Sequence, residues 1–176
     1  MSAKKHEEKA ARAFPKLRFV IVTVSSSRYQ NKSRGEPYKD ESGDVAQSEI
    51  TSKGHDVVWR TLVSDDVLQI RYAVLKSLVE KDCDVCVTLG GTGISPRDVT
   101  IEALSAIIEK QLPGFGELFR AESIKEIGPP ALLTRAIAGV TSGRLIVALP
   151  GSPDAALYGI RLLIIQAAHI ISIARQ

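Results

Sequence analysis

The chain has 176 residues, of which 44% are hydrophobic and 24% are charged, so it is long and apolar enough to bury one core. A net charge of +3 and an aromatic content of 5% do not indicate a nucleic-acid-binding surface. The longest apolar stretch, residues 162–174, is shorter than the roughly 20 residues that a membrane span needs, so it predicts a core-facing helix.

The first sixteen residues mix Lys, Arg and Glu and lack the apolar segment of a signal peptide. We expect a solvated tail over residues 1–16 and a single domain over residues 17–176. No internal repeat or linker divides that domain. The expected location is cytoplasmic.

Apolar runs rich in β-branched residues predict strands over residues 17–25, 55–63 and 84–89. Between them, apolar residues at three- and four-residue spacing predict helices over 44–54 and 65–81. This alternation predicts βαβ crossovers and a parallel sheet with helices on both faces. The expected fold class is therefore α/β, with three αβα layers.

The second half of the chain predicts a helix over 98–110, then a turn, another helix and a stop at Pro129 and Pro130. Residues 136–140 and 144–149 read as a hairpin, so the mostly parallel sheet gains an antiparallel edge. The last helix begins with Ser152 as N-cap and Pro153 at the first helical position.

Residues 25–43 do not fit this alternation. They are polar, contain four basic residues including Arg28, and show no periodicity. The stretch predicts a long structureless connection, which inside a compact domain is functional or disordered. Because it follows the first strand, it emerges at the carboxyl edge of the sheet.

Cys83 and Cys86 form a CxxC pair, but residues three apart in a strand point to opposite faces. No second Cys or His pair has zinc-finger spacing. We therefore expect two buried, reduced thiols. We likewise expect His55 and His169 to be core side chains rather than ligands.

Two glycine-containing loops follow predicted strands: "GGTG" (Gly90, Gly91, Thr92, Gly93) and "PGSP" (Pro150 to Pro153). Both lead into helices, whose N-terminal N–H groups favour anions, and both lie at the edge where parallel sheets bind ligands. The alternative is that "GGTG" is only a tight turn. Neither the Walker A nor the Rossmann glycine pattern is present.

Asp65 and Asp98 are predicted at the same edge. Beside a phosphate cradle, carboxylates would repel the substrate unless a hard cation lies between them, and Mg²⁺ is bound by one or two carboxylates plus substrate phosphates. The alternative is that Asp98 caps the following helix and that Asp65 and Asp66 cap theirs. Arg97 either neutralises substrate charge or points to solvent.

Four segments, "TLGGTGISPRDVTIEAL", "LPGFGELFR", "LLTRAIAGV" and "LPGSPDAAL", together closely resemble the molybdopterin-binding family that contains MoaB, MogA and the gephyrin G domain. The resemblance covers residues 17–174 in the same order. It implies a three-layer α/β domain that assembles as a trimer or hexamer. It also implies adenylylation of molybdopterin, in which the terminal phosphate attacks the α-phosphate of Mg²⁺-bound ATP and releases pyrophosphate.

The family's GGTG-x-x-x-x-D motif places its aspartate at Asp98, and its second functional aspartate falls on Asp65. Both are implied to be catalytic and to hold the metal. The resemblance implies that substrate is bound by Ser25, Gly90, Gly91, Thr92, Gly93, Arg97, Pro150, Gly151 and Ser152.

The chain departs from the family after the first strand, where many relatives have Ser-Asp and this chain has Ser25 and Ser26. That departure supports an alternative, a non-catalytic protein that binds or carries molybdopterin. The implied partners are molybdopterin, ATP and a metal-insertion protein, with neither nucleic acid nor membrane.

Overall fold

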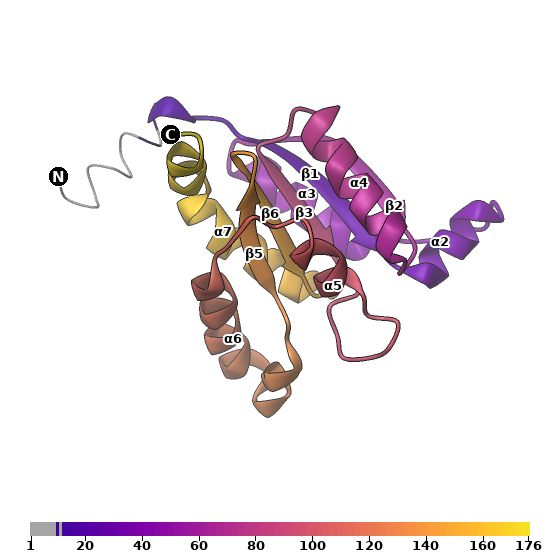
Figure 1. Ribbon diagram of the computed structural model, residues 1–176. Coiled ribbons are helices and arrows are strands. Elements are labelled where there is room, and N and C mark those ends of the chain that lie inside the picture. The colour runs from indigo at the N-terminus through magenta and orange to yellow at the C-terminus, as the bar shows by residue number, and fades with distance from the viewer. Residues whose placement is uncertain (1–9, 11) are drawn as a thin grey trace.

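The computed structural model describes residue 10 and residues 12–176, which form one mixed sheet flanked by helices (Figure 1). In chain order the elements are β1 (Arg18–Val24), α2 (Ser26–Ser33), α3 (Glu41–Ser52), β2 (Asp56–Val63), α4 (Val67–Val79), β3 (Val85–Leu89), α5 (Thr100–Ser105), β4 (Lys110–Gln111), α6 (Pro113–Ile127), the 3₁₀ helix η1 (Pro129–Leu133), β5 (Ile137–Thr141), β6 (Arg144–Leu149) and α7 (Pro153–Ala174).

The six strands lie in the order β2-β1-β3-β6-β5-β4. β2, β1, β3 and β6 are parallel to one another, whereas β5 is antiparallel to both β6 and β4. This confirms the mostly parallel sheet with an antiparallel edge hairpin, and it adds β4 beyond that hairpin. The chain runs outward from β1 to β2 and then returns to β3 on the other side of β1. The direction of winding therefore reverses between β1 and β3, and ligands bind at such a point in open α/β sheets.

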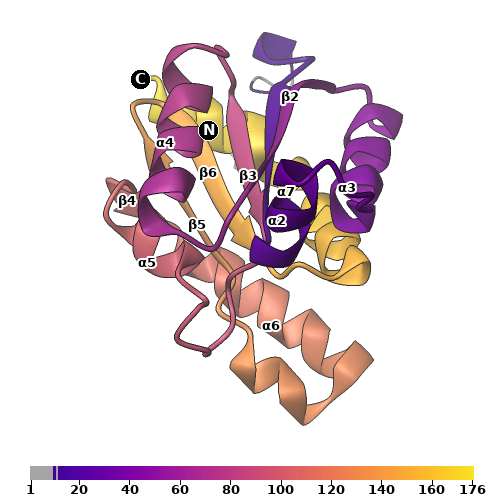
Figure 2. The ribbon, with the colours of Figure 1, turned by 90° about the vertical axis from the view of Figure 1, so that its right-hand side faces the viewer.

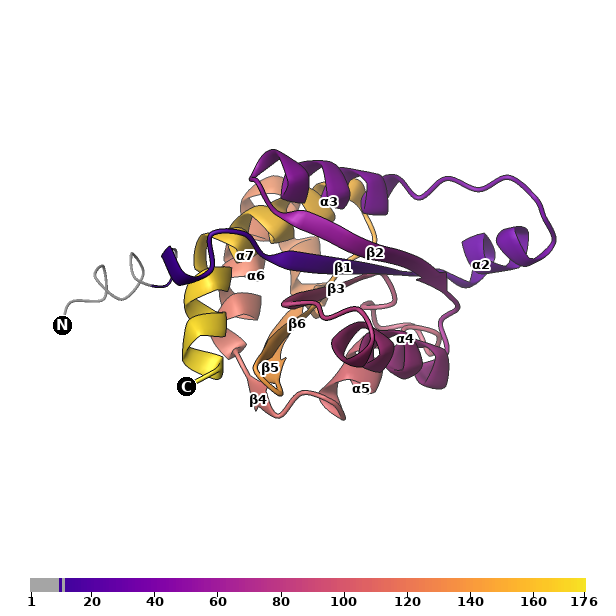
Figure 3. The ribbon, with the colours of Figure 1, turned by 90° about the horizontal axis from the view of Figure 1, so that it is seen from above.

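Helices cover both faces of the sheet, which confirms the three-layer prediction. Figure 3 shows α3, α6 and α7 along one face and α4 and α5 along the other. The alternation of side chains along β1 supplies both cores, because Phe19 and Ile21 pack under α3 and α7 while Val20 and Val22 pack under α4 and α5. The sheet is thus buried on both faces, as expected for a parallel sheet.

Helix α7 is 22 residues long and, by length and composition, apolar enough to cross a membrane. It packs along the sheet instead, with buried side chains at helical spacing that include Ile160, Leu163 and Ile171. The prediction of a core-facing helix over 162–174 is confirmed. Ser152 accepts a hydrogen bond from Ala155 N (3.3 Å), which confirms the predicted N-cap.

The prediction of a structureless connection over 25–43 is wrong. Ser26–Ser33 form α2, capped by Ser25, and α3 begins at Glu41 rather than at residue 44, capped by Asp40. Helix α2 buries none of its residues and projects beyond the sheet (Figure 3). Since it has no core face, it carries none of the apolar periodicity that identifies a helix in a sequence.

The helix predicted over 98–110 is too long, because α5 ends at Ser105. Residues 109–112 pair with β5 instead: Glu109 N donates to Val140 O (3.1 Å) and Leu112 N donates to Ala138 O (2.8 Å). This pairing joins residues that are distant in the sequence, so no local sequence pattern predicts it.

Cys83 and Cys86 are free and buried, as predicted, and burial raises the pKa of both thiols. Residues 1–9 and 11 of the predicted tail lie outside the described residues. At the end of that tail, Phe14 packs against the core.

Candidate functional site

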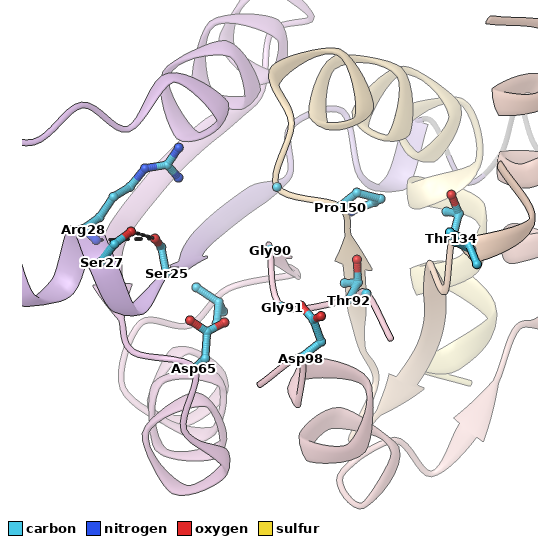
Figure 4. Close-up of a pocket in the computed structure, with 14 residues that line it drawn as sticks. Ser25, Ser27, Arg28, Asp65, Gly90, Gly91, Thr92, Asp98, Thr134 and Pro150 are labelled. Atoms are coloured by element: carbon cyan, nitrogen blue, oxygen red, sulfur yellow. Dashed lines mark hydrogen bonds between the residues drawn. The ribbon is translucent and has the colours of Figure 1, made fainter. Parts of the chain in front are cut away.

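The carboxyl ends of β1, β3 and β6 open onto a cavity of about 480 Å³ at the point where the winding of the sheet reverses (Figure 4). The cavity is lined by Val24, Ser25, Ser27, Arg28, Asp65, Gly90, Gly91, Thr92, Gly93, Asp98, Leu133, Thr134, Pro150 and Gly151. Segments that are far apart in the sequence thus meet at one edge of the sheet.

The glycines of the loop after β3 are required by close packing of backbone against backbone. Gly90 and Gly91 have φ of 107° and 63°, in the region that side chains disfavour. A Cβ at Gly90 would clash with the carbonyl oxygen of Val24, and one at Gly91 would clash with Thr100 Oγ1. The loop therefore lies directly against the end of β1. The Thr100 hydroxyl also holds the loop by donating a hydrogen bond to Gly90 O (2.8 Å).

Several backbone N–H groups lining the cavity have no acceptor among the residues that the structure describes. Those of Gly91, Thr92, Gly93 and Gly151 donate to no other group in the described part of the chain. The N-termini of α2 and α7 adjoin the same cavity through Ser25 and Gly151. Free N–H groups beside helix N-termini are suited to bind an anion.

Asp65 is held by the start of α2. Its Oδ2 accepts hydrogen bonds from Ser26 N (2.7 Å) and Ser26 Oγ (2.7 Å), while its Oδ1 accepts none from the described residues. The capping alternative applies to its neighbour, because Asp66 caps α4 by accepting from Gln69 N (2.8 Å). Asp65 is thereby left to face the cavity (Figure 4).

Asp98 does not cap α5, whose N-cap is Val99 with no side-chain hydrogen bond. Its Oδ2 instead accepts from Ser95 N (2.9 Å) within the loop, and its Oδ1 accepts from no described residue. In Figure 4 Asp65 and Asp98 flank Gly91. The structure therefore brings the two predicted aspartates to one cavity, each with one oxygen open.

Two predicted residues lie outside the cavity lining. The side chain of Arg97 is exposed, and Ser152 is occupied as the cap of α7. The basic residue in the lining is Arg28, from the first turn of α2 (Figure 4).

The prediction of site residues missed Val24, Ser27, Leu133 and Thr134. The last two come from η1 and the segment after it, on the opposite side of the cavity from Arg28 (Figure 4). Leu133 and Thr134 belong to the segment "LLTRAIAGV" that carries part of the family resemblance, but no residue type in it indicates a binding site. The segment reaches the cavity because the chain between η1 and β5 lies beside the loop after β3, where Arg135 contacts Thr92 and Asp98.

The donor set fits a hard cation that is shared with a substrate. No group of three or more His, Cys, Asp or Glu residues is arranged for a metal among residues 10 and 12–176. Two carboxylate oxygens, Asp65 Oδ1 and Asp98 Oδ1, are open beside the free N–H groups. Mg²⁺ is commonly held in this way, by one or two carboxylates with phosphate oxygens and water completing the shell.

An αβα fold whose glycine loop has free N–H groups, with two open carboxylates beside it, has the features of the class of α/β proteins that bind a ligand at the carboxyl edge of the sheet. The sequence pattern described as "Probable molybdopterin binding domain" matches residues 20–169. The chain therefore belongs to the family of molybdopterin-binding domains.

Similar proteins span nearly the whole chain. A protein of Methanocaldococcus jannaschii named probable molybdopterin adenylyltransferase is 38% identical over 161 residues, covering 91% of this chain and 95% of its own. The molybdenum cofactor biosynthesis protein B of Bacillus cereus is 39% identical, covering 94% and 92%. The solved structure of the tungsten cofactor synthesizing protein MoaB from Pyrococcus furiosus superposes with a TM-score of 0.81 at 34% identity, covering 92% of this chain and 98% of that one.

Proposed function

We propose that this protein is a molybdopterin adenylyltransferase of molybdenum or tungsten cofactor biosynthesis. The observation that carries the proposal is the combination, in one cavity, of free backbone N–H groups and two carboxylates that each have an open oxygen. The name of the relative from M. jannaschii favours a transferase over a protein that only carries the pterin.

In the proposed reaction, an oxygen of the terminal phosphate of molybdopterin forms a bond to the α-phosphorus of ATP. The bond from that phosphorus to the oxygen bridging to the β-phosphate breaks, and pyrophosphate leaves. The nucleophile needs no general base, because a phosphate monoester with a second pKa of about 6 is already ionised at neutral pH. This fits a cavity lined by no histidine among the described residues.

The residues of this chain then have to bind and align two anions. The N–H groups of Gly91, Thr92 and Gly93 cradle phosphate oxygens, and Arg28 adds positive charge on the α2 side of the cavity. Asp65 and Asp98 are proposed to hold Mg²⁺ through their open oxygens. When bound, that ion neutralises charge that builds up on the phosphates during transfer.

The test is anaerobic incubation of the protein with molybdopterin, Mg²⁺ and ATP, followed by assay of AMP-linked pterin and pyrophosphate. Asp65→Asn and Asp98→Asn each keep the shape of the side chain and remove its charge. We expect each to lower turnover by about 10²-fold or more with little change in thermal stability.

The matched control is Asp66→Asn, which changes the neighbouring carboxylate outside the cavity. Since Asn is an equally good N-cap, α4 should remain intact and turnover should stay close to that of the wild type. Full turnover by Asp98→Asn would sink its catalytic role. Tight binding of molybdopterin by the wild type without any product would favour the carrier alternative.

The proposed assembly is a homotrimer or hexamer, and the proposed location is the cytoplasm, where ATP is supplied. A metal-insertion protein would receive the adenylylated pterin. Large exposed apolar side chains on α4, α6 and η1 support the assembly.

A further inference from the structure

The two arms of the loop between β3 and α5 are joined by the side chain of Arg135, which comes from a distant part of the chain. Arg135, between η1 and β5, donates from Nε to Thr92 O (3.1 Å) and from Nη2 to Asp98 O (3.2 Å). Its Nη1 binds Glu102 Oε1 (2.5 Å) on α5. The guanidinium therefore joins the first half of the loop at Thr92, its second half at Asp98 and the following helix α5.

The loop has few other restraints at its middle. Residues 94–97 are exposed, and the bonds within this part are Ser95 N to Asp98 Oδ2 and Asp98 N to Ser95 O, both 2.9 Å, with Arg97 N to Ser95 Oγ (3.3 Å). These bonds fix the turn over residues 95–98, but they do not fix the distance between this turn and the other residues that line the cavity. The contacts of Arg135 span that distance, because Thr92 and Asp98 lie on opposite arms of the loop.

Only arginine suits this position. Three nitrogens of one rigid plane donate in three directions, to two carbonyls and a carboxylate. A lysine ammonium at the end of a flexible chain keeps the charge but does not reproduce the fork. The hydrogen bond from Arg135 also lowers the pKa of the Glu102 carboxyl, so Glu102 stays ionised beside the guanidinium.

We infer that Arg135 is a positioning residue that sets the separation between the N–H groups at Thr92 and the carboxylate of Asp98. It touches neither group's functional atoms, and it acts through the two backbone carbonyls. The expected effect of Arg135 on turnover rests on the proposed function. The expected effect of Arg135 on the loop does not depend on that function.

The experiment compares Arg135→Lys with Glu102→Gln in the full-length protein. Hydrogen–deuterium exchange is followed at the amides of Ser95, Asp98 and Thr100, and kcat and KM are measured in the adenylylation assay. Arg135→Lys should speed exchange at these amides by about tenfold and lower kcat by about 10²-fold, with a smaller change in KM. Glu102→Gln breaks the ion pair but keeps both loop carbonyls bonded, so it should change either quantity less than threefold.

A further readout separates positioning from general stability. In the background of Asp98→Asn, Arg135→Lys should cause no further loss of turnover, because the group that it positions is already removed. Unchanged loop exchange in Arg135→Lys, or faster exchange with wild-type kcat, would overturn the inference. A third outcome separates the two claims. If the wild type shows no turnover but Arg135→Lys still speeds exchange in the loop, the proposed function is wrong and the role of Arg135 in holding the loop is supported.

Discussion

All the hydrogen-bonding capacity of the Ser26 hydroxyl is taken up by Asp65 and its neighbour Ser64. It has one proton and two lone pairs: it donates to Asp65 Oδ2 (2.7 Å), accepts from Asp65 N (3.1 Å), and lies 2.9 Å from Ser64 Oγ. Ser26 is the residue that departs from the family pattern, and on the sequence alone that departure supports the carrier alternative. In the structure its hydroxyl binds an aspartate that lines the cavity, so the departure is compatible with the proposed adenylyltransferase.

Replacing Ser26 with Ala should therefore lower kcat by about 10- to 100-fold and raise the Mg²⁺ concentration needed for half-maximal turnover, since Asp65 loses a bond that orients it. Ser26→Thr keeps the hydroxyl and should retain most of the activity. Ser33→Ala, at the other end of α2, is the control and should match the wild type. Equal kinetics for Ser26→Ala and Ser33→Ala would argue against a positioning role for Ser26.

Gly91 illustrates a second constraint on single residues. Its φ is positive and a Cβ there would meet Thr100 Oγ1, so Gly91→Ala should lower the free energy of unfolding by about 3 kcal/mol. Gly54 also has positive φ but has open space around it, so Gly54→Ala should cost only about 1 kcal/mol. Urea unfolding of both variants measures the difference. Equal losses of unfolding free energy in the two variants would mean that the packing of Gly91 against Thr100 does not contribute to the effect.

Helices α3 and α7 are joined by a pair of residues 112 positions apart. Arg161 Nε donates to Glu49 Oε1 (3.0 Å), and the side chain of Glu49 is only 10% exposed. This hydrogen bond from Arg161 lowers the pKa of Glu49 below its ordinary 4.5. Because the folded-state pKa is depressed, the contribution to stability is fully present above pH 4.5 and is lost as the pH falls through the lowered value.

Glu49→Gln should thus unfold at a lower urea concentration than the wild type at pH 7, and the difference between the two midpoints should shrink as the pH falls below 4.5. Glu80→Gln, which breaks the exposed pair with Lys76 on α4, is the control and should change the midpoint very little at any pH. A difference that does not shrink at any pH below 4.5 at which the wild type stays folded would show that the Glu49–Arg161 pair is not its source.

At the scale of the whole molecule, one face of α4 is apolar and exposed. Leu68, Tyr72, Leu75 and Val79 are 73%, 64%, 46% and 80% exposed, and their 4-3-4 spacing is that of a seam between helices. Helix α6 and the segment after it project beyond the sheet (Figures 1 and 2). Both α6 and η1 carry further exposed apolar side chains. We expect the α4 face to be covered in the assembled protein.

Sedimentation equilibrium of the wild type should give the mass of three or six chains. Val79→Lys places a charge in the seam and should lower the mass of the assembly while leaving the circular dichroism spectrum unchanged. Ile173→Lys, which changes an apolar side chain of α7 that is 58% exposed, is the control and should keep the wild-type mass. A monomeric wild type would contradict the proposed assembly.

The sequence by itself determined the αβα fold, because apolar runs and helical spacing are local and recur in every core element from β1 to α7. It also placed Gly91, Asp65 and Asp98 at one edge, since parallel strands bring their carboxyl ends together. These features follow from residues that are close along the chain.

Only the tertiary structure decided which aspartates cap helices and which face the cavity. Asp66 caps α4 while Asp65 binds Ser26, a choice that depends on a contact 39 residues away. Strand β4, the place of Thr134 in the cavity lining and the contacts of Arg135 with the loop after β3 have the same origin. Each depends on packing between segments distant in the sequence, and such contacts leave no periodicity or spacing in the chain itself.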